Sequence, residues 1–219
     1  MKKQMIVVAG GSGIRMGTEI PKQFILLNGK AILLHTLERI AEEIEIENII
    51  LVLPESEIDR WVALSSGTKF DNLKCALGGA TRYDSVKSGL KLIDKDALVG
   101  IHDAVRPFVS QNTIASCFKM AEEKGSAIPV VELKDSIRRV FTGTSRAKDR
   151  TKFRLVQTPQ CFNAARIKAA YEKPNKGNFT DDASVYEEAG NRIHLVEGNN
   201  ENIKITSPED LKIAASFLS

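Results

Sequence analysis

This sequence has few cysteines and lacks any long apolar run. Its 219 residues contain three cysteines, Cys75, Cys117 and Cys161, and no C-x-x-C pair. Neither a zinc knuckle nor a disulfide framework is indicated, and we expect each cysteine to be a small buried side chain in a reducing compartment. The apolar run after Lys3 ends at Ala9, too short for a signal peptide, and no segment approaches the length of a membrane span. These absences predict a cytoplasmic protein that does not enter a membrane.

An excess of charge of one sign is also missing. The 31 basic and 28 acidic residues leave a net charge of +3, and no dense basic stripe with interleaved aromatic residues is present. Nucleic acid is therefore not an expected partner. A hydrophobic content of 42% is ordinary for a globular protein with a buried core. The length fits one domain, which we take to span residues 1–219.

Short apolar runs alternate with helical patterns, a rhythm typical of a mostly parallel sheet covered by helices. Strands are predicted at 5–9, 48–53, 73–77, 98–102 and 126–131, with helices at 31–43, 55–65, 81–93 and 111–124. Farther along the chain, helices are predicted at 163–172, 180–190 and 208–218, and strands at 193–197 and 202–206. The predicted fold class is α/β, with a mixed, mostly parallel sheet.

The rhythm breaks between the strand at 126–131 and residue 157. Two β-like runs, 132–140 and 150–156, flank a polar Thr-Gly-Thr-Ser stretch, and no helical pattern is available to cover them. We predict a protruding β-arm at about 132–157. Because a two-stranded arm is marginally stable alone, we expect it to pack on a second copy of the chain, and an unpartnered surface hairpin is the alternative.

A glycine-rich loop with a nearby pair of cations follows the first predicted strand. The loop reads Ala9-Gly10-Gly11-Ser12-Gly13, and Arg15 and Lys22 come after it. Glycines let backbone N–H groups approach an anion, which the two cations would then face. The spacing matches neither a Walker A motif nor a G-x-G-x-x-G fingerprint. We predict a phosphate-binding loop; a plain tight turn is the alternative, but it leaves the two cations unexplained.

A second group of candidates lies at the carboxyl end of the strand predicted at 98–102. Ligands of open α/β sheets bind at that edge. Asp103 could hold a divalent cation there and Arg106 could grip an anion, whereas a solvated ion pair is the alternative. His102 stands alone on an apolar strand, and we expect it to be a core residue without a chemical role.

Single residues elsewhere in the sequence add to these candidates. Gly79 and Ser85 open a helix and could contact a base edge, and Arg150 on the predicted arm supplies another cation. Lys204 interrupts a β-branched run, which is costly unless the ammonium meets an anion or water. Thr180 is either a helix N-cap or a substrate contact.

Taken together, these segments resemble the 2-C-methyl-D-erythritol 4-phosphate cytidylyltransferases of the non-mevalonate isoprenoid route. The resemblance covers nearly the whole chain through an ordered set of motifs at 9–16, 21–23, 78–79, 102–107, 158–160, 180–184 and 201–206. It implies a Rossmann-like nucleotidyltransferase domain and a homodimer whose arms reach the neighbouring active site. It also implies Mg²⁺ as cofactor and transfer of CMP from CTP to the polyol phosphate, with release of pyrophosphate.

The resemblance also implies a role for each candidate residue. Residues that would promote catalysis are Arg15, Lys22, Arg150 and Lys204. Residues that would bind the nucleotide are Ala9, Gly10, Gly11, Ser12, Gly13, Gly79, Ser85 and Asp103. Residues that would bind the acceptor are Asp103, Arg106, Ser136, Arg150, Thr158, Thr180 and Lys204, with Asp103 as the metal ligand.

Three departures from the family pattern leave alternatives open. The loop begins Ala9-Gly10-Gly11 where Ala-Ala-Gly is frequent, Ala80 stands where an acidic residue is frequent, and Ser136 replaces threonine. The Ala-Gly-Gly form also resembles ribitol-5-phosphate cytidylyltransferases, so ribitol phosphate is the alternative acceptor. A nicotinamide-dependent oxidoreductase is a more remote alternative. Such an enzyme needs an acidic residue for the ribose about 20 residues after the glycines, and in this sequence that position falls within a predicted helix.

Overall fold

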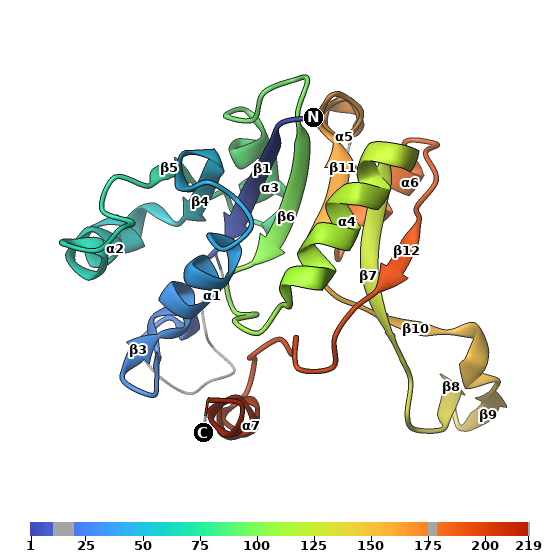
Figure 1. Ribbon diagram of the computed structural model, residues 1–219. Coiled ribbons are helices and arrows are strands. Elements are labelled where there is room, and N and C mark those ends of the chain that lie inside the picture. The colour runs from blue at the N-terminus through green and yellow to red at the C-terminus, as the bar shows by residue number, and fades with distance from the viewer. Residues whose placement is uncertain (11–19, 175–178, 219) are drawn as a thin grey trace.

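The computed structural model describes residues 1–10, 20–174 and 179–218, and the chain forms an α/β fold around one large sheet (Figure 1). In the described residues this sheet has eight strands. Their bounds are β1 (Lys3–Val8), β4 (Ile49–Leu53), β5 (Lys74–Leu77), β6 (Leu98–Asp103), β7 (Ser126–Glu132), β10 (Arg154–Val156), β11 (Gln160–Asn163) and β12 (Leu195–Glu197). The strands β5, β4, β1 and β6 run parallel in that order, whereas β11 runs antiparallel to both β6 and β7. The predicted fold class is confirmed.

Helices cover both faces of the sheet because the central strands are apolar on both faces. Met5 and Val7 of β1 belong to one buried cluster, and Ile6 and Val8 belong to the other. This alternation is the two-residue period of a strand. One face is covered by α1 (Ile32–Ile40), α2 (Ile58–Ser65) and α4 (Gln111–Lys124), and the other by α3 (Arg82–Leu90), α5 (Ala164–Glu172) and α6 (Asp182–Glu188).

Short elements complete the connections and the C-terminal region. The final helix α7 (Pro208–Ser216) begins with a capping box between Ser207 and Asp210, which explains the predicted start at this position. The remaining short elements are β2 (Leu26–Leu27), β3 (Lys30–Ala31), η2 (Lys22–Phe24), η3 (Ile46–Asn48), η4 (Glu55–Glu57) and η5 (Arg150–Lys152). No helix within the described ranges is both long and apolar enough to cross a membrane.

Cys75 is exposed, not buried as expected, whereas Cys117 and Cys161 are buried. Two predictions about strands were also wrong. Residues 202–206 form no strand, because this segment is held by isolated hydrogen bonds such as the one from Ile205 N–H to Val105 O (3.0 Å). The strand β11, which pairs with β6, was not predicted, because its four residues directly precede α5 and carry no separate pattern. This strand places Gln160 beside the carboxyl end of β6, so Gln160 was also missing from the predicted site residues.

The segment between β7 and β10 also pairs differently from the prediction. The strands β8 (Ile137–Phe141) and β9 (Thr144–Lys148) pair with each other around a tight turn in which Gly143 has a φ of 74°. Residues 154–156 pair instead with β7 of the main sheet. Figure 1 shows the β8–β9 hairpin beyond the end of β7, away from the covering helices. Its role as a dimerisation arm stays a prediction.

Candidate active site

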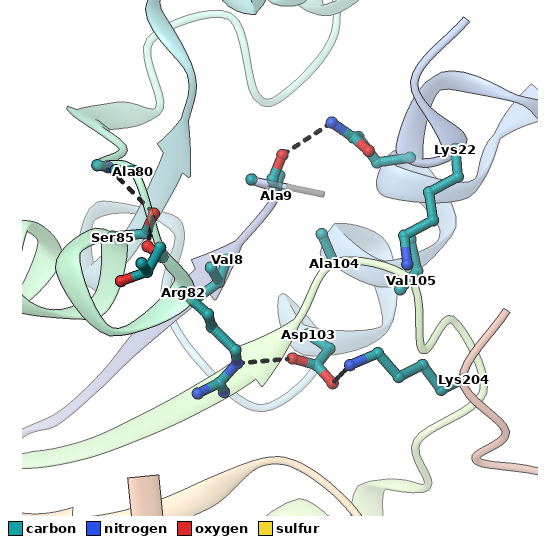
Figure 2. A pocket seen from close by; sticks show the side chains of 14 residues that line it. Val8, Ala9, Lys22, Ala80, Arg82, Ser85, Asp103, Ala104, Val105 and Lys204 are labelled. Carbon is teal, nitrogen blue, oxygen red and sulfur yellow. Dashed lines mark hydrogen bonds and ion pairs between the residues drawn. The ribbon is translucent and has the colours of Figure 1, made fainter. Parts of the chain in front are cut away.

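A cavity of about 290 Å³ lies at the carboxyl ends of β1 and β6, which is the sheet edge expected for ligand binding (Figure 2). Its wall combines the end of β1, the turn before α3, and side chains from η2, β6 and the segment after β12. The described lining residues are Val8, Ala9, Gly10, Lys22, Gln23, Gly79, Ala80, Thr81, Arg82, Ser85, Asp103, Ala104, Val105 and Lys204.

Three cations surround the carboxylate of Asp103 in this cavity. Lys204 Nζ lies 3.0 Å from Asp103 Oδ2, and the Nε atoms of Arg82 and Arg106 each lie 3.4 Å from a carboxylate oxygen. Figure 2 shows Arg82 and Lys204 reaching Asp103 from opposite sides. Burial alone would raise the pKa of Asp103, but the charges of these three neighbours outweigh it and hold the pKa well below the usual range. Asp103 is therefore ionised at neutral pH and holds the cations close together.

A second cavity, of about 310 Å³, adjoins the first. Arg82, Asp103 and Lys204 line both cavities and so form the boundary between them. The other described residues of the second cavity are Arg106, Val156, Gln157, Thr158, Gln160, Thr180, Asp181 and Ser184. Two reactants that occupied the two cavities would meet at this charged boundary.

The turn before α3 is shaped by the hydroxyl of Ser85. This side chain is 2% exposed, donates to Thr81 O (2.9 Å) and accepts from Gly79 N–H (3.1 Å). Gly79 has no room for a side chain, because an added Cβ would lie 2.3 Å from Asp84 Cβ. Thr81 and Asp84 form a capping box at the start of α3. These contacts fix the backbone of residues 78–81 against the cavity.

Buried hydrogen bonds hold the segment that carries Lys204. Arg106 donates to Asn202 O (2.7 Å), and Asn202 Nδ2 donates to Thr158 O (2.9 Å). The hydroxyl of Thr158 accepts from Asp103 N–H (3.1 Å) and lies 3.0 Å from His102 Nδ1. These bonds tie residues 202–204 to the end of β6, so the loop brings its lysine to Asp103 without forming a strand.

His102 supports this network from the core, as expected. It is fully buried, and its Nε2 lies 3.1 Å from Arg106 O, which can only accept, so Nε2 carries the proton. Burial lowers the pKa of His102 to about 4. The ring is therefore neutral at neutral pH, and its Nδ1 accepts the hydroxyl proton of Thr158.

Lys22, the first residue of η2, also lines the first cavity. Its neighbour Gln23 is buried and donates from Nε2 to Ala9 O (2.7 Å), which joins η2 to the end of β1. This bond places the lysine beside the strand end from which the glycine loop departs. Figure 2 shows the Lys22 side chain extending along the cavity wall toward Val105.

Most of the predicted site residues that the structure describes line these two cavities. Ala9, Gly10, Lys22, Gly79, Ser85, Asp103 and Lys204 line the first, and Asp103, Arg106, Thr158, Thr180 and Lys204 line the second. In the described part of the chain, Ser136 and Arg150 line neither, because they lie in the segment beyond β7. Gly11, Ser12, Gly13 and Arg15 lie outside the described residues.

Sequence reasoning missed Arg82 and Gln160, and the structure rules out one of the two alternatives for Thr180. The N-cap of α6 is Asp181, which accepts from Ser184 N–H, so Thr180 is not the cap; it is exposed and lines the second cavity. Arg82 was passed over although it opens α3 directly after the glycine turn. Its position there was the one available signal.

The described residues do not fit a metal site held by the protein alone. No group of three His, Cys, Asp or Glu side chains able to hold a metal ion occurs among them. Both oxygens of Asp103, the predicted ligand, are already within 3.4 Å of a cation. One carboxylate in that setting is a poor ligand set for Mg²⁺, which prefers several oxygen ligands in an octahedral arrangement.

Comparison with known proteins shows the family. Residues 4–219 match the sequence model of the IspD family, described as 2-C-methyl-D-erythritol 4-phosphate cytidylyltransferase. The chain belongs to this family. Membership in the IspD family confirms the predicted resemblance and the predicted enzyme class, a cytidylyltransferase.

Individual relatives match along their whole length. The chain is 46% identical over 219 residues to a 2-C-methyl-D-erythritol 4-phosphate cytidylyltransferase from Bacteroides thetaiotaomicron, and all of both chains is covered. It is 48% identical to the protein of the same name from Bacteroides fragilis, again over all of both chains. The crystal structure of a 4-diphosphocytidyl-2C-methyl-D-erythritol synthase from Anaerococcus prevotii aligns with a TM-score of 0.86 at 29% identity, covering 99% of this chain and 96% of that one.

Proposed function

We propose that this protein transfers CMP from CTP to 2-C-methyl-D-erythritol 4-phosphate, giving CDP-methylerythritol and pyrophosphate, in the non-mevalonate isoprenoid route. The observation that carries the proposal is the match to the IspD family over residues 4–219. The paired cavities with a shared cationic boundary agree with a reaction between two phosphate compounds. The proposal extends to a cytoplasmic location, where CTP is available.

The chemistry needs alignment and positive charge more than a base. An oxygen of the acceptor phosphate forms a bond to the α-phosphorus of CTP, while the bond from that phosphorus to the oxygen bridging to the β-phosphate breaks and pyrophosphate leaves. A phosphate monoester is already ionised at neutral pH, so no side chain has to remove a proton. Fixed cations that face the phosphates would stabilise the charge that shifts in the transition state.

The two cavities suggest where each reactant binds. CTP would occupy the first, with its base against the turn at Gly79 and Ser85 and its phosphates toward the end of β1 and Lys22. The acceptor would occupy the second, between Thr158 and Thr180, with its phosphate toward Lys204. Mg²⁺, which the described residues do not hold by themselves, would enter with the phosphates of CTP.

The segment at about 132–157 would complete the site of a second subunit. Arg150 and Ser136 are exposed and line neither cavity, and the hairpin between them exposes Val140 (78%) and Phe141 (40%) to solvent. An isolated hairpin with exposed apolar side chains gains stability by packing on a partner. We therefore propose a homodimer in which Arg150 and Ser136 contact the acceptor bound to the partner.

Pyrophosphate release tests the proposed function directly. The purified protein is incubated with CTP, Mg²⁺ and either methylerythritol phosphate or ribitol 5-phosphate. Release with the first and little with the second is expected. The opposite preference would assign the ribitol reaction, and release with neither would refute the proposal. A separate thermal-unfolding measurement compares ligands: CTP with Mg²⁺ should raise the melting temperature of the protein, whereas NAD, the control ligand, should not.

A further inference from the structure

Arg82 lies at the boundary of the two cavities and was not among the candidates from the sequence. We infer that Arg82 binds phosphate at the reaction centre and that Asp182 and Tyr171 are the positioning residues that fix it. This inference rests on the proposed function and adds a further cation to it.

The guanidinium of Arg82 is clamped on two sides. Its Nη1 and Nη2 donate to the two carboxylate oxygens of Asp182 at 3.0 and 2.8 Å, and its Nε lies 3.4 Å from Asp103 Oδ1. Such a bidentate pair fixes both the place and the plane of the guanidinium. Tyr171 donates its hydroxyl to Asp182 Oδ1 at 2.7 Å, which orients the carboxylate in turn.

Asp182 is held by rigid parts of the fold. Its side chain is fully buried, and Gln160 Oε1 of β11 accepts from the N–H groups of Asp182 (3.0 Å) and Ala183 (2.8 Å). The ring of Tyr171 stacks on that of Tyr83, with 4.6 Å between centroids. A carboxylate anchored to a strand and to two helices can fix a cation before any substrate arrives, which is the arrangement that electrostatic catalysis requires.

Arg82 keeps hydrogen-bonding capacity for a ligand. A guanidinium has five N–H groups, and the contacts to Asp182 and Asp103 use three of them. The side chain remains 25% exposed, and it lines both cavities. An arginine that served only to link α3 and α6 would not need to line both cavities. The remaining N–H groups are in place to contact the phosphate oxygens that meet as the new bond to the α-phosphorus forms.

A charge-balanced double variant separates this role from a structural one. Replacing Arg82→Gln together with Asp182→Asn removes both charges and keeps polar groups of similar size, so no unpaired buried charge remains. The matched control is Lys87→Ala on the same helix, because Lys87 pairs with Glu172 of α5 at 3.7 Å outside both cavities. For each protein, kcat, the KM of both substrates and the melting temperature are measured by pyrophosphate release and thermal unfolding.

The folded double variant should lose about 100-fold in kcat, comparable to removal of one transition-state donor, with smaller changes in KM. The control should keep the wild-type kcat. A loss below about tenfold would assign Arg82 to structure alone and overturn the inference. If the double variant does not unfold cooperatively, Arg82→Lys is measured instead and judged by the same tenfold threshold in kcat. Lysine keeps the buried charge but lacks the planar guanidinium that donates two parallel hydrogen bonds. A wild-type protein that releases no pyrophosphate would instead refute the proposed function.

Discussion

Removal of the charge at Asp103 tests the electrostatics of the site most directly. Asp103→Asn keeps the shape of the side chain but leaves the three surrounding cations without the carboxylate that lies 3.0 to 3.4 Å from them. Since Asp103 is 7% exposed, the change breaks buried ion pairs, which costs about 3–5 kcal/mol when one partner is removed. For a chain of this size, that cost lowers the melting temperature by roughly 6–20 °C.

The pH dependence of this loss has a definite sign. The pKa of Asp103 in the folded protein lies below its ordinary value of 3.8, so the carboxylate stabilises the fold fully above that value. The stabilisation is lost only as the pH falls further, toward the pKa of the folded state. The difference in melting temperature between wild type and variant should therefore be constant between about pH 6 and 8 and shrink below about pH 4.

Thermal unfolding followed by circular dichroism measures both effects. Asp94→Asn is the matched control, because Asp94 pairs with Lys2 at 2.8 Å on the exposed surface, and its loss should change the melting temperature little. Added inorganic phosphate should stabilise Asp103→Asn more than wild type, since an anion can replace the missing carboxylate. An unchanged melting temperature in Asp103→Asn, or equal shifts in variant and control, would refute the electrostatic reasoning.

Three further predictions concern the other parts of the site. Lys22→Ala should lower kcat by about 100-fold with less effect on the KM of CTP, in a pyrophosphate-release assay, because the charge that it faces develops in the transition state. Arg150→Ala should raise the KM of the acceptor. If the arm serves the partner's site, dimers of one Arg150→Ala subunit and one Lys22→Ala subunit should recover activity, because one of their two sites keeps both residues. Thr158→Val should lower the free energy of unfolding by about 1–3 kcal/mol in urea titrations, because Asp103 N–H and His102 Nδ1 lose their buried partner.

Much of the architecture followed from local patterns. The alternation of apolar runs and helical segments predicted the order of the main strands and helices through β7, and the Ser-Pro start of α7 predicted its N-terminus. The cavity also lies at the predicted edge of the sheet, the carboxyl ends of the strands, where ligands of such sheets bind. These predictions succeeded because each depends on residues that are neighbours along the chain.

The segment around Lys204 shows where local patterns fail. Its β-branched residues favour a strand, but Asn202 and Arg106 hold the backbone through hydrogen bonds to distant partners, and no sheet forms there. Lys204 nevertheless lines both cavities, as its position in an apolar run suggested, because a lysine there has to find an anion or water. The anion that it finds is Asp103.

The glycine turn before α3, the N-cap of α7 and the succession of the main strands and helices through β7 were determined by the sequence alone, because each arises from interactions within a few residues. The surroundings of Arg82 were decided by the tertiary structure. Asp182 stands 100 positions farther along the chain, and it reaches the guanidinium because β11 pairs with β6 and α5 packs against both α3 and α6. Such a contact depends on the order of strands in the sheet, and no local pattern carries that information.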